Sequence, residues 1–198
     1  MKDLKGEKKK MKTSQSGIDL IKSFEGLRLK SYKALTSEKY YTIGYGHYGE
    51  TNPNRTITKE EAESILISDL SKYEKNVNYI NERGGYNFNQ NEFDALVSFA
   101  YNIGSINQLT NYGKRTRDEI RAKIPLYNKA NGYVLSGLTK RRAKELELFN
   151  TPVTSKYTED TTIREIVDDV IDGKFGNGEI RERNIYSVIQ DFVNKRFS

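Results

Sequence analysis

A short stretch near the N-terminus, residues 16–48, constrains the fold more than any other part of the chain. Within this stretch the pattern of apolar residues changes from that of a helix to that of β-strands. Ser16 is a suitable N-cap, and Asp19 three residues later completes a start that resembles a capping box. The apolar residues that follow recur at helical spacing and predict one buried face: Ile18, Ile21 and Phe24. Gly26 is the expected end of this amphipathic helix.

A β-hairpin is expected directly after the helix. Ser31–Lys33 is the predicted first strand, and Tyr40–Tyr45 is the second because it is rich in aromatic and β-branched residues. Gly44 and Gly46 leave the backbone bare on either side of one tyrosine, as expected where a ligand approaches closely. Together with the helices that follow, this hairpin predicts an α+β fold.

Glu25 lies at the end of the predicted helix and beside its apolar face. The negative end of the helix dipole and partial desolvation both disfavour the charged form of a carboxyl group at such a position. A glycosidase general acid needs a carboxyl group that keeps its proton near neutral pH. Glu25 is therefore a candidate general acid.

The chain between the hairpin and residue 150 is predicted to be mostly helical. Capping boxes open three helices: Thr58 with Glu61, Asn89 with Glu92, and Thr116 with Glu119. The helix after Thr58 is expected to be long, and it should join the hairpin lobe to a helical lobe with a cleft between them. A basic helix, Leu138–Phe149, closes this part of the chain.

Composition narrows the classes of function. The chain has no cysteine and one histidine, so neither a disulfide nor a zinc site is expected. No apolar run approaches the roughly 18 residues of a membrane span, and no signal-peptide core is present. The net charge of +6 favours a polyanionic partner. Because no nucleic-acid motif accompanies this charge, the anionic wall of a Gram-positive bacterium is the preferred partner and specific nucleic-acid binding is not expected.

Composition also divides the chain into four parts. Residues 1–15 form a lysine-rich tail that is expected to be disordered, and residues 16–151 form the main domain. Residues 152–160 are a polar linker. Residues 161–198 show helical apolar spacing interrupted by glycines, which predicts a three-helix mini-bundle.

Three blocks of sequence are informative because they occur together and in order: FEGLRLKSY with YTIGYGH, then FNQNEFDALVSFAYNIG, then LYNKANGYVLSGLTKRRAKELELF. They resemble the phage-type lysozymes of glycoside hydrolase family 24, and the resemblance covers residues 16–151. It implies a mostly helical, two-lobed lysozyme-like domain with a small β-hairpin lobe. It also implies an endolysin that needs no cofactor and hydrolyses the β-1,4 bond between N-acetylmuramic acid and N-acetylglucosamine in peptidoglycan, mostly with inversion.

The resemblance implies a Glu-Asp-Thr triad. Glu25 matches the glutamate and Thr42 matches the threonine, but the aspartate position is occupied by Ala34. Glu38, in a turn about two residues longer than usual, is the nearest replacement carboxylate. Loss of the aspartate leaves two alternatives open. One is a lytic transglycosylase, in which the 6-hydroxyl of the substrate attacks, and the other is a non-catalytic wall-binding protein.

Further residues are predicted to bind substrate. Tyr41 and Tyr45 have the apolar face and polar tip of sugar-stacking side chains. In the resembling family the histidine, His47 in this chain, supports the cleft, and Asn102 is a candidate sugar contact.

The segment VIDGKFGNGEIRER within residues 161–198 resembles the muropeptide-binding repeats at the C-termini of some streptococcal-phage lysozymes. The residues predicted to bind the wall are Asp172, Gly176, Asn177, Gly178 and Arg181. One repeat implies weak anchoring. The whole chain is expected to be a monomer without membrane insertion that stays in the host cytoplasm until a separate holin gives it access to the wall.

Overall fold

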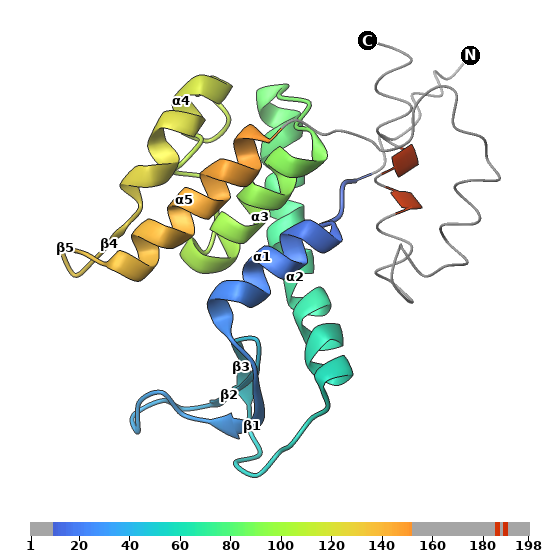
Figure 1. Cartoon of the computed structure of the whole chain (residues 1–198), viewed down its shortest axis with the longest axis vertical. Coiled ribbons are helices and arrows are strands. Elements are labelled where there is room, and N and C mark those ends of the chain that lie inside the picture. The colour runs from blue at the N-terminus through green and yellow to red at the C-terminus, as the bar shows by residue number, and fades with distance from the viewer. Residues whose placement is uncertain (1–9, 152–184, 187, 190–198) are drawn as a thin grey trace.

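The computed structural model describes residues 10–151, 185–186 and 188–189, and its labelled helices and strands lie within residues 10–151. The elements are α1 (Gln15–Glu25), β1 (Arg28–Tyr32), β2 (Tyr41–Gly44), β3 (His47–Glu50), α2 (Lys59–Gly84), α3 (Gln90–Ile103), α4 (Arg117–Lys123), η1 (Ile124–Leu126), β4 (Lys129–Ala130), β5 (Tyr133–Val134) and α5 (Ser136–Asn150). Figure 1 shows the sheet β1-β2-β3 at one end of the domain and helices α3, α4 and α5 at the opposite end. Helix α2 runs between the two ends. The predicted α+β fold with two lobes is confirmed.

Helix α3 is the centre of the helical lobe. Every residue from Glu92 to Ala100 is buried, and the helix packs against α1, α2 and α5. A helix that is buried all round must satisfy its own polar side chains inside the protein. Asp94 and Ser98 do so by binding groups from other elements, and these two contacts tie the segment before α1 and the helix α5 to α3.

The three predicted capping boxes are confirmed. The side chains of Thr58, Asn89 and Thr116 each accept a hydrogen bond from the backbone of the glutamate three residues later, which caps them in return. Helix α2 ends at Gly85, whose φ of 63° is the left-handed conformation that glycine favours. These local signals place the starts of α2, α3 and α4 within one residue.

The predicted start of α1 is wrong. The N-cap is Ser14 rather than Ser16, and its side chain makes no hydrogen bond to the helix. Instead the Ser14 hydroxyl and backbone N–H both donate to Asp94 on α3. Asp19 does not complete a capping box, and its carboxylate accepts a hydrogen bond from Gln15 at 2.7 Å. A tertiary partner therefore takes the place of the local cap.

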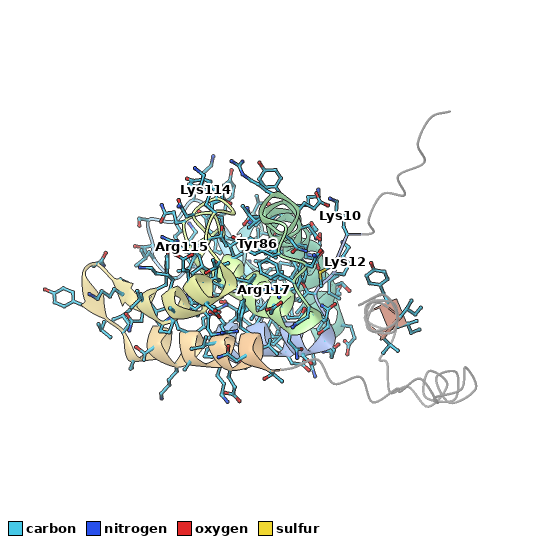
Figure 2. The ribbon with its side chains drawn as sticks, turned by 90° about the horizontal axis from the view of Figure 1, so that it is seen from above. Lys10, Lys12, Tyr86, Lys114, Arg115 and Arg117 are labelled. Carbon is cyan, nitrogen blue, oxygen red and sulfur yellow. The ribbon has the colours of Figure 1, made fainter. Side chains whose placement is uncertain are left out.

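The segment before α1 lies along α2, so the domain begins earlier than residue 16. The Met11 N–H donates to Asn78 at 2.9 Å, and the Thr13 N–H donates to Glu74 at 2.9 Å. Lys12 forms an ion pair with the same glutamate at 3.0 Å. Figure 2 shows Lys10 and Lys12 of this segment on the same side of the domain. The expectation of a disordered tail is wrong for residues 10–15, and residues 1–9 lie outside the described residues.

Asp94, which accepts the hydrogen bonds from Ser14, makes the stability of the protein depend on pH. Burial raises the pKa of Asp94 from 3.8 to about 7, although Ser14 and Gln90 donate hydrogen bonds to its carboxylate. Between about pH 4 and about pH 7 the folded protein therefore binds a proton that the unfolded chain has lost. The stability that comes from this proton is fully present below about pH 4 and is lost as the pH rises through about 7.

Asp94→Asn is expected to remove this part of the pH dependence, because an amide cannot ionise and its oxygen still accepts hydrogen bonds. The variant should gain stability relative to the unaltered protein as the pH rises from about 5 to about 8. Urea unfolding midpoints at the two pH values measure the change. A difference between the two proteins that stays constant with pH contradicts the assignment.

The sheet contains one strand more than predicted. The hairpin of β1 and β2 is present, with Tyr32 opposite Thr42, and β3 pairs with the other edge of β2. Gly44 and Gly46, with φ of 66° and 92°, form the tight turn that joins β2 to β3. The sequence of β3, His-Tyr-Gly-Glu, has neither strand periodicity nor several β-branched residues, so its pairing comes from the turn that precedes it.

Candidate active site

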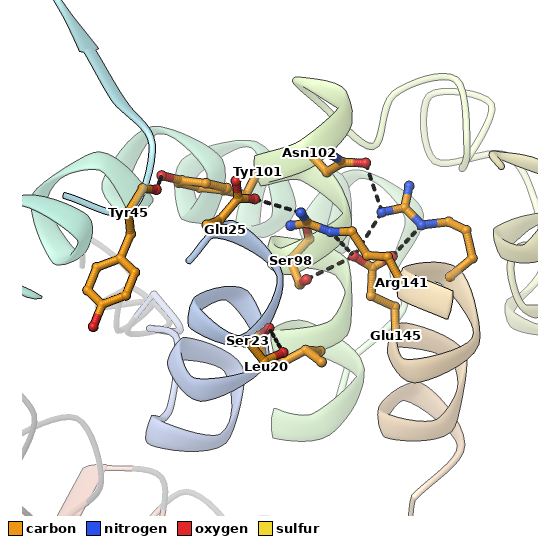
Figure 3. A network of polar contacts seen from close by, with 10 residues as sticks. Leu20, Ser23, Glu25, Tyr45, Ser98, Tyr101, Asn102, Arg141 and Glu145 are labelled. Carbon is orange, nitrogen blue, oxygen red and sulfur yellow. Dashed lines mark hydrogen bonds and ion pairs between the residues drawn. The ribbon is translucent and has the colours of Figure 1, made fainter. Parts of the chain in front are cut away.

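Glu25 is the last residue of α1, and its carboxylate points toward Tyr101 and the guanidinium of Arg141 (Figure 3). Gly26 follows with φ of 68°, which lets the chain leave the helix at once toward β1. The β2–β3 turn approaches the carboxylate closely. A β-carbon on Gly46 would lie 3.5 Å from Oε2 of Glu25 and 3.7 Å from the hydroxyl of Tyr101. Glu25 therefore lies where α1, the sheet and α3 meet.

Arg141 on α5 holds the other oxygen of Glu25. Its Nη1 lies 2.6 Å from Oε1, and Arg141 is only 4% exposed (Figure 3). The same guanidinium donates to the Ser98 carbonyl at 3.2 Å and pairs with Glu145 at 3.1 Å. A planar guanidinium with several fixed partners orients a carboxylate more firmly than a solvated cation does. The electrostatic environment of Glu25 therefore includes the positive charge of Arg141 as well as the dipole of α1.

Behind Arg141 lies a buried charge cluster, which consists of Arg141, Arg142 and Glu145. Glu145 is fully buried, and its carboxylate accepts a hydrogen bond from the Ser98 hydroxyl at 2.8 Å. Arg142 pairs with Glu145 at 2.7 Å and donates to Asn102 at 3.1 Å. With Glu25 the group contains two positive and two negative side chains. The arginines of the basic helix α5 are thus paired with acidic neighbours.

A cleft of about 350 Å³ opens in front of Glu25. Its wall is formed by Glu25, Gly46, His47, Tyr48, Asp69, Lys72, Tyr73, Tyr101 and Asn102. Sheet residues thus form one side, while α2 and the end of α3 form the other. Burial and the nearby Glu25 carboxylate raise the pKa of Tyr101, whose hydroxyl donates to the Tyr45 carbonyl at 2.8 Å. This hydrogen bond joins α3 to the β2–β3 turn.

Three predicted site residues, Glu25, His47 and Asn102, line this cleft. The Nδ1 of His47 lies 2.8 Å from Asp69 on α2, so the histidine links the sheet to α2. Asn102 accepts its hydrogen bond from Arg142, which connects the cleft wall to the buried charge cluster.

The remaining predicted residues lie elsewhere. Thr42 is half-buried on β2, and Tyr41 beside it is half-buried with the Lys33 ammonium 4.9 Å from its ring centroid. Tyr45 is only 5% exposed, and Figure 3 shows its ring turned away from Glu25, so its burial does not suit a sugar-stacking role. The predicted wall-binding residues lie outside the described residues: Asp172, Gly176, Asn177, Gly178 and Arg181.

Glu38 stabilises the turn in which it lies. Its carboxylate accepts a hydrogen bond from the Ala34 N–H at 2.9 Å, and its own N–H donates to the Leu35 carbonyl at 3.1 Å. Ala34 stands where the resembling enzymes have their aspartate. The carboxylate of Glu38 is therefore located at the backbone of that position, although Glu38 does not line the cleft of the described structure.

Several residues of the site could not be assigned from sequence. Asp69, Lys72 and Tyr73 come from one face of α2, where the helical pattern predicts Tyr73 as a core residue. The available signal is the spacing of Asp69 and Lys72, three residues apart, because it places two opposite charges on one face of the helix. Arg141 lies 116 residues from Glu25, and nothing in the local pattern pairs them.

No group of three or more His, Cys, Asp or Glu side chains suited to a metal ion occurs among the described residues. In the same part of the chain, no helix combines the length and apolar character needed to span a membrane.

A carboxylate at a helix end, facing a cleft between a small antiparallel sheet and a helical lobe, defines a lysozyme-like protein. Residues 22–145 match the family described as Phage lysozyme, and the chain belongs to this family. It is 44% identical over 158 residues to an endolysin of Bacillus phage PZA, covering 77% of this chain and 60% of that protein. It is 46% identical over 147 residues to an endolysin of Lactococcus phage c2, covering 73% and 63%. The chain thus spans about three fifths of the length of these phage relatives.

A solved structure has the same fold. The muramidase domain of SpmX from Asticaccaulis excentricus is 36% identical, with a TM-score of 0.59, and the match covers 72% of this chain and 99% of that domain. The family match extends from within α1 to within α5 and includes every residue that lines the cleft.

Proposed function

We propose that this protein is a phage or prophage endolysin that hydrolyses the β-1,4 bond between N-acetylmuramic acid and N-acetylglucosamine in peptidoglycan. The observation that supports this most is the position of Glu25, which lies at the cleft and is held by Arg141 at 2.6 Å. In this mechanism Glu25 donates its proton to the glycosidic oxygen as the bond breaks through an oxocarbenium-like state.

The attacking water needs a second group. We assign this role to Glu38 together with Thr42, because the Glu38 carboxylate binds the N–H of Ala34, where related enzymes have an aspartate. An inverting glycosidase keeps its two carboxyl groups about 6.5–9.5 Å apart so that a water fits between them. Both residues belong to the sheet lobe: Thr42 lies on β2, and Glu38 lies in the turn between β1 and β2. Tyr41 and Asn102 remain proposed substrate contacts, and His47 a supporting residue.

The positive charge of the chain supports an anionic wall as the partner. In the described part, Lys114, Arg115 and Arg117 lie together beside Tyr86 (Figure 2). Arg117 is 3.6 Å from Glu92, so part of this charge is already neutralised, and a general attraction to anionic wall polymers is more consistent with it than a specific site. We further propose that residues 161–198 bind muropeptides and that a monomer reaches the wall from the cytoplasm through a separate holin.

Analysis of the reaction products tests the proposed reaction. Purified Gram-positive peptidoglycan digested with the full chain is expected to give reducing muramic acid ends, which mass spectrometry after borohydride reduction identifies. Ends with 1,6-anhydro-muramic acid would contradict hydrolysis and the role of Glu38 in holding water. Binding to the wall without any released fragment would contradict an enzymatic function altogether.

A further inference from the structure

The cleft contains a cation that no other part of the described structure neutralises. Lys72 lines the cleft from α2, one turn after Asp69. Within residues 10–151 it forms no ion pair, whereas the other basic groups near Glu25 do. Arg141 pairs with Glu25 and Glu145, and Lys22 pairs with Glu63 at 2.5 Å. Lys72 is thus a cation without a carboxylate partner in a cleft that otherwise contains two carboxylates.

The conformation of the neighbouring groups leaves this ammonium available. Asp69, the carboxylate nearest to Lys72 in sequence on that face, is engaged by His47 at 2.8 Å. The Lys72 Nζ lies 4.6 Å from the ring centroid of Tyr73, which in turn packs against Tyr101 with ring centroids 5.2 Å apart. A cation over an aromatic face loses part of its freedom but keeps its hydrogen-bond donors. Lys72 is therefore partly ordered before any ligand binds.

The proposed substrate has its negative charge in one place only. The sugar rings and N-acetyl groups of the glycan are neutral, while carboxylates occur on the 3-substituent of muramic acid, either as the free lactyl group or on the stem peptide. An ammonium in the cleft can bind such a carboxylate, and a neutral glycan offers it no equivalent. The remaining acids of the cleft, Glu25 and Asp69, would repel the same group.

We propose that Lys72 is a specificity residue that binds a carboxylate on the 3-substituent of muramic acid. This inference rests on the proposed function, since it assigns a contact to the same cleft. Lys72 does not touch the reacting bond in this proposal, so it acts on substrate binding rather than on proton transfer.

The test compares Lys72→Met, which keeps a flexible apolar chain over Tyr73, with Lys72→Arg, which keeps the charge. Lys75→Met is the matched control, because Lys75 is exposed on the same helix and does not line the cleft. Each full-length variant is assayed on three forms of one solubilised glycan: with intact stem peptides, with stems removed by an amidase, and with carboxyl groups converted to amides.

For Lys72→Met we expect KM on the carboxylate-bearing glycan to rise about tenfold with kcat nearly unchanged, because a charge-assisted contact contributes to ground-state and transition-state binding alike. On the amidated glycan, the KM of Lys72→Met should equal that of the unaltered protein. Lys72→Arg and Lys75→Met should have the KM of the unaltered protein on all three forms of the glycan. An effect that persists on the stripped glycan assigns the contact to the lactyl group, and one confined to intact stems assigns it to the peptide.

Equal losses on native and amidated glycan, a loss in kcat alone, or a similar loss in Lys75→Met would each overturn the proposal. Failure of the proposed function is a separate result. In that case the unaltered protein releases no muramic acid ends from any of the three forms.

Discussion

Glu25→Gln is expected to lower kcat on peptidoglycan by about a thousandfold while KM changes little. Glutamine has nearly the same shape and still lines the cleft, but it has no proton to give to the leaving oxygen, and general-acid catalysis typically contributes about 10²- to 10⁴-fold. The rate of release of reducing ends from purified wall measures the effect. Circular dichroism and the urea midpoint establish that the variant remains folded.

Glu63→Gln provides the control for this prediction. Glu63 also pairs with a basic residue next to the site, Lys22 on α1, but it does not line the cleft. Its loss should leave the rate within about twofold, because a partly exposed ion pair contributes little. If Glu25→Gln digests the wall at the rate of Glu63→Gln, the carboxylate at the end of α1 is not the acid.

Glu145→Gln is expected to destabilise the protein by about 3–5 kcal/mol, the usual cost of removing one partner from a buried ion pair. Glu145 is fully buried and is the shared partner of Arg141 and Arg142, which are 4% and 1% exposed. Without its charge Arg141 retains Glu25 as its one carboxylate partner among the described residues, and Arg142 retains none. The urea midpoint should fall in proportion, and the rate at saturating substrate should fall as well, because Arg141 orients Glu25.

Glu147→Gln is the matched control on the same helix. Glu147 also pairs with a basic residue three positions earlier, Lys144, at 2.7 Å, but its side chain is 64% exposed. The expected change in stability is below about 0.5 kcal/mol, since water replaces the lost contact. Equal destabilisation by the two substitutions would mean that the buried charge cluster does not depend on the Glu145 charge.

Features of the structure that depend on residues close together in the sequence could be predicted, and features that depend on residues far apart could not. The starts of α2, α3 and α4 follow from pairs three residues apart, and the structure has each pair in place. The position of Glu25 at the end of α1 follows from the glycine beside it. Such features are set by the backbone and its immediate neighbours, and the sequence contains them almost completely.

Features that depend on distant partners were missed. Ser14 begins α1 because Asp94, 80 residues away, binds it. The same applies to Arg141, whose pairing with Glu25 requires α5 to pack beside α1. Two tyrosines of the cleft, Tyr73 and Tyr101, were also beyond reach, because they have the spacing of core residues and lie at the edge of the core.

The connection between α1 and β1 consists of Gly26 and Leu27, and the start of α2 is joined to the same sheet by the hydrogen bond from Ile57 to Leu29 at 2.9 Å. Glu25 therefore lies beside the connection about which a rotation of one lobe against the other would take place. Displacement in a rotation grows with distance from its axis, so such a rotation would move Glu25 little and would move Glu38, which lies beyond β1 in the sheet lobe, farther. Opening and closing of the cleft would thus adjust the site of the attacking water and leave the proton donor in its place.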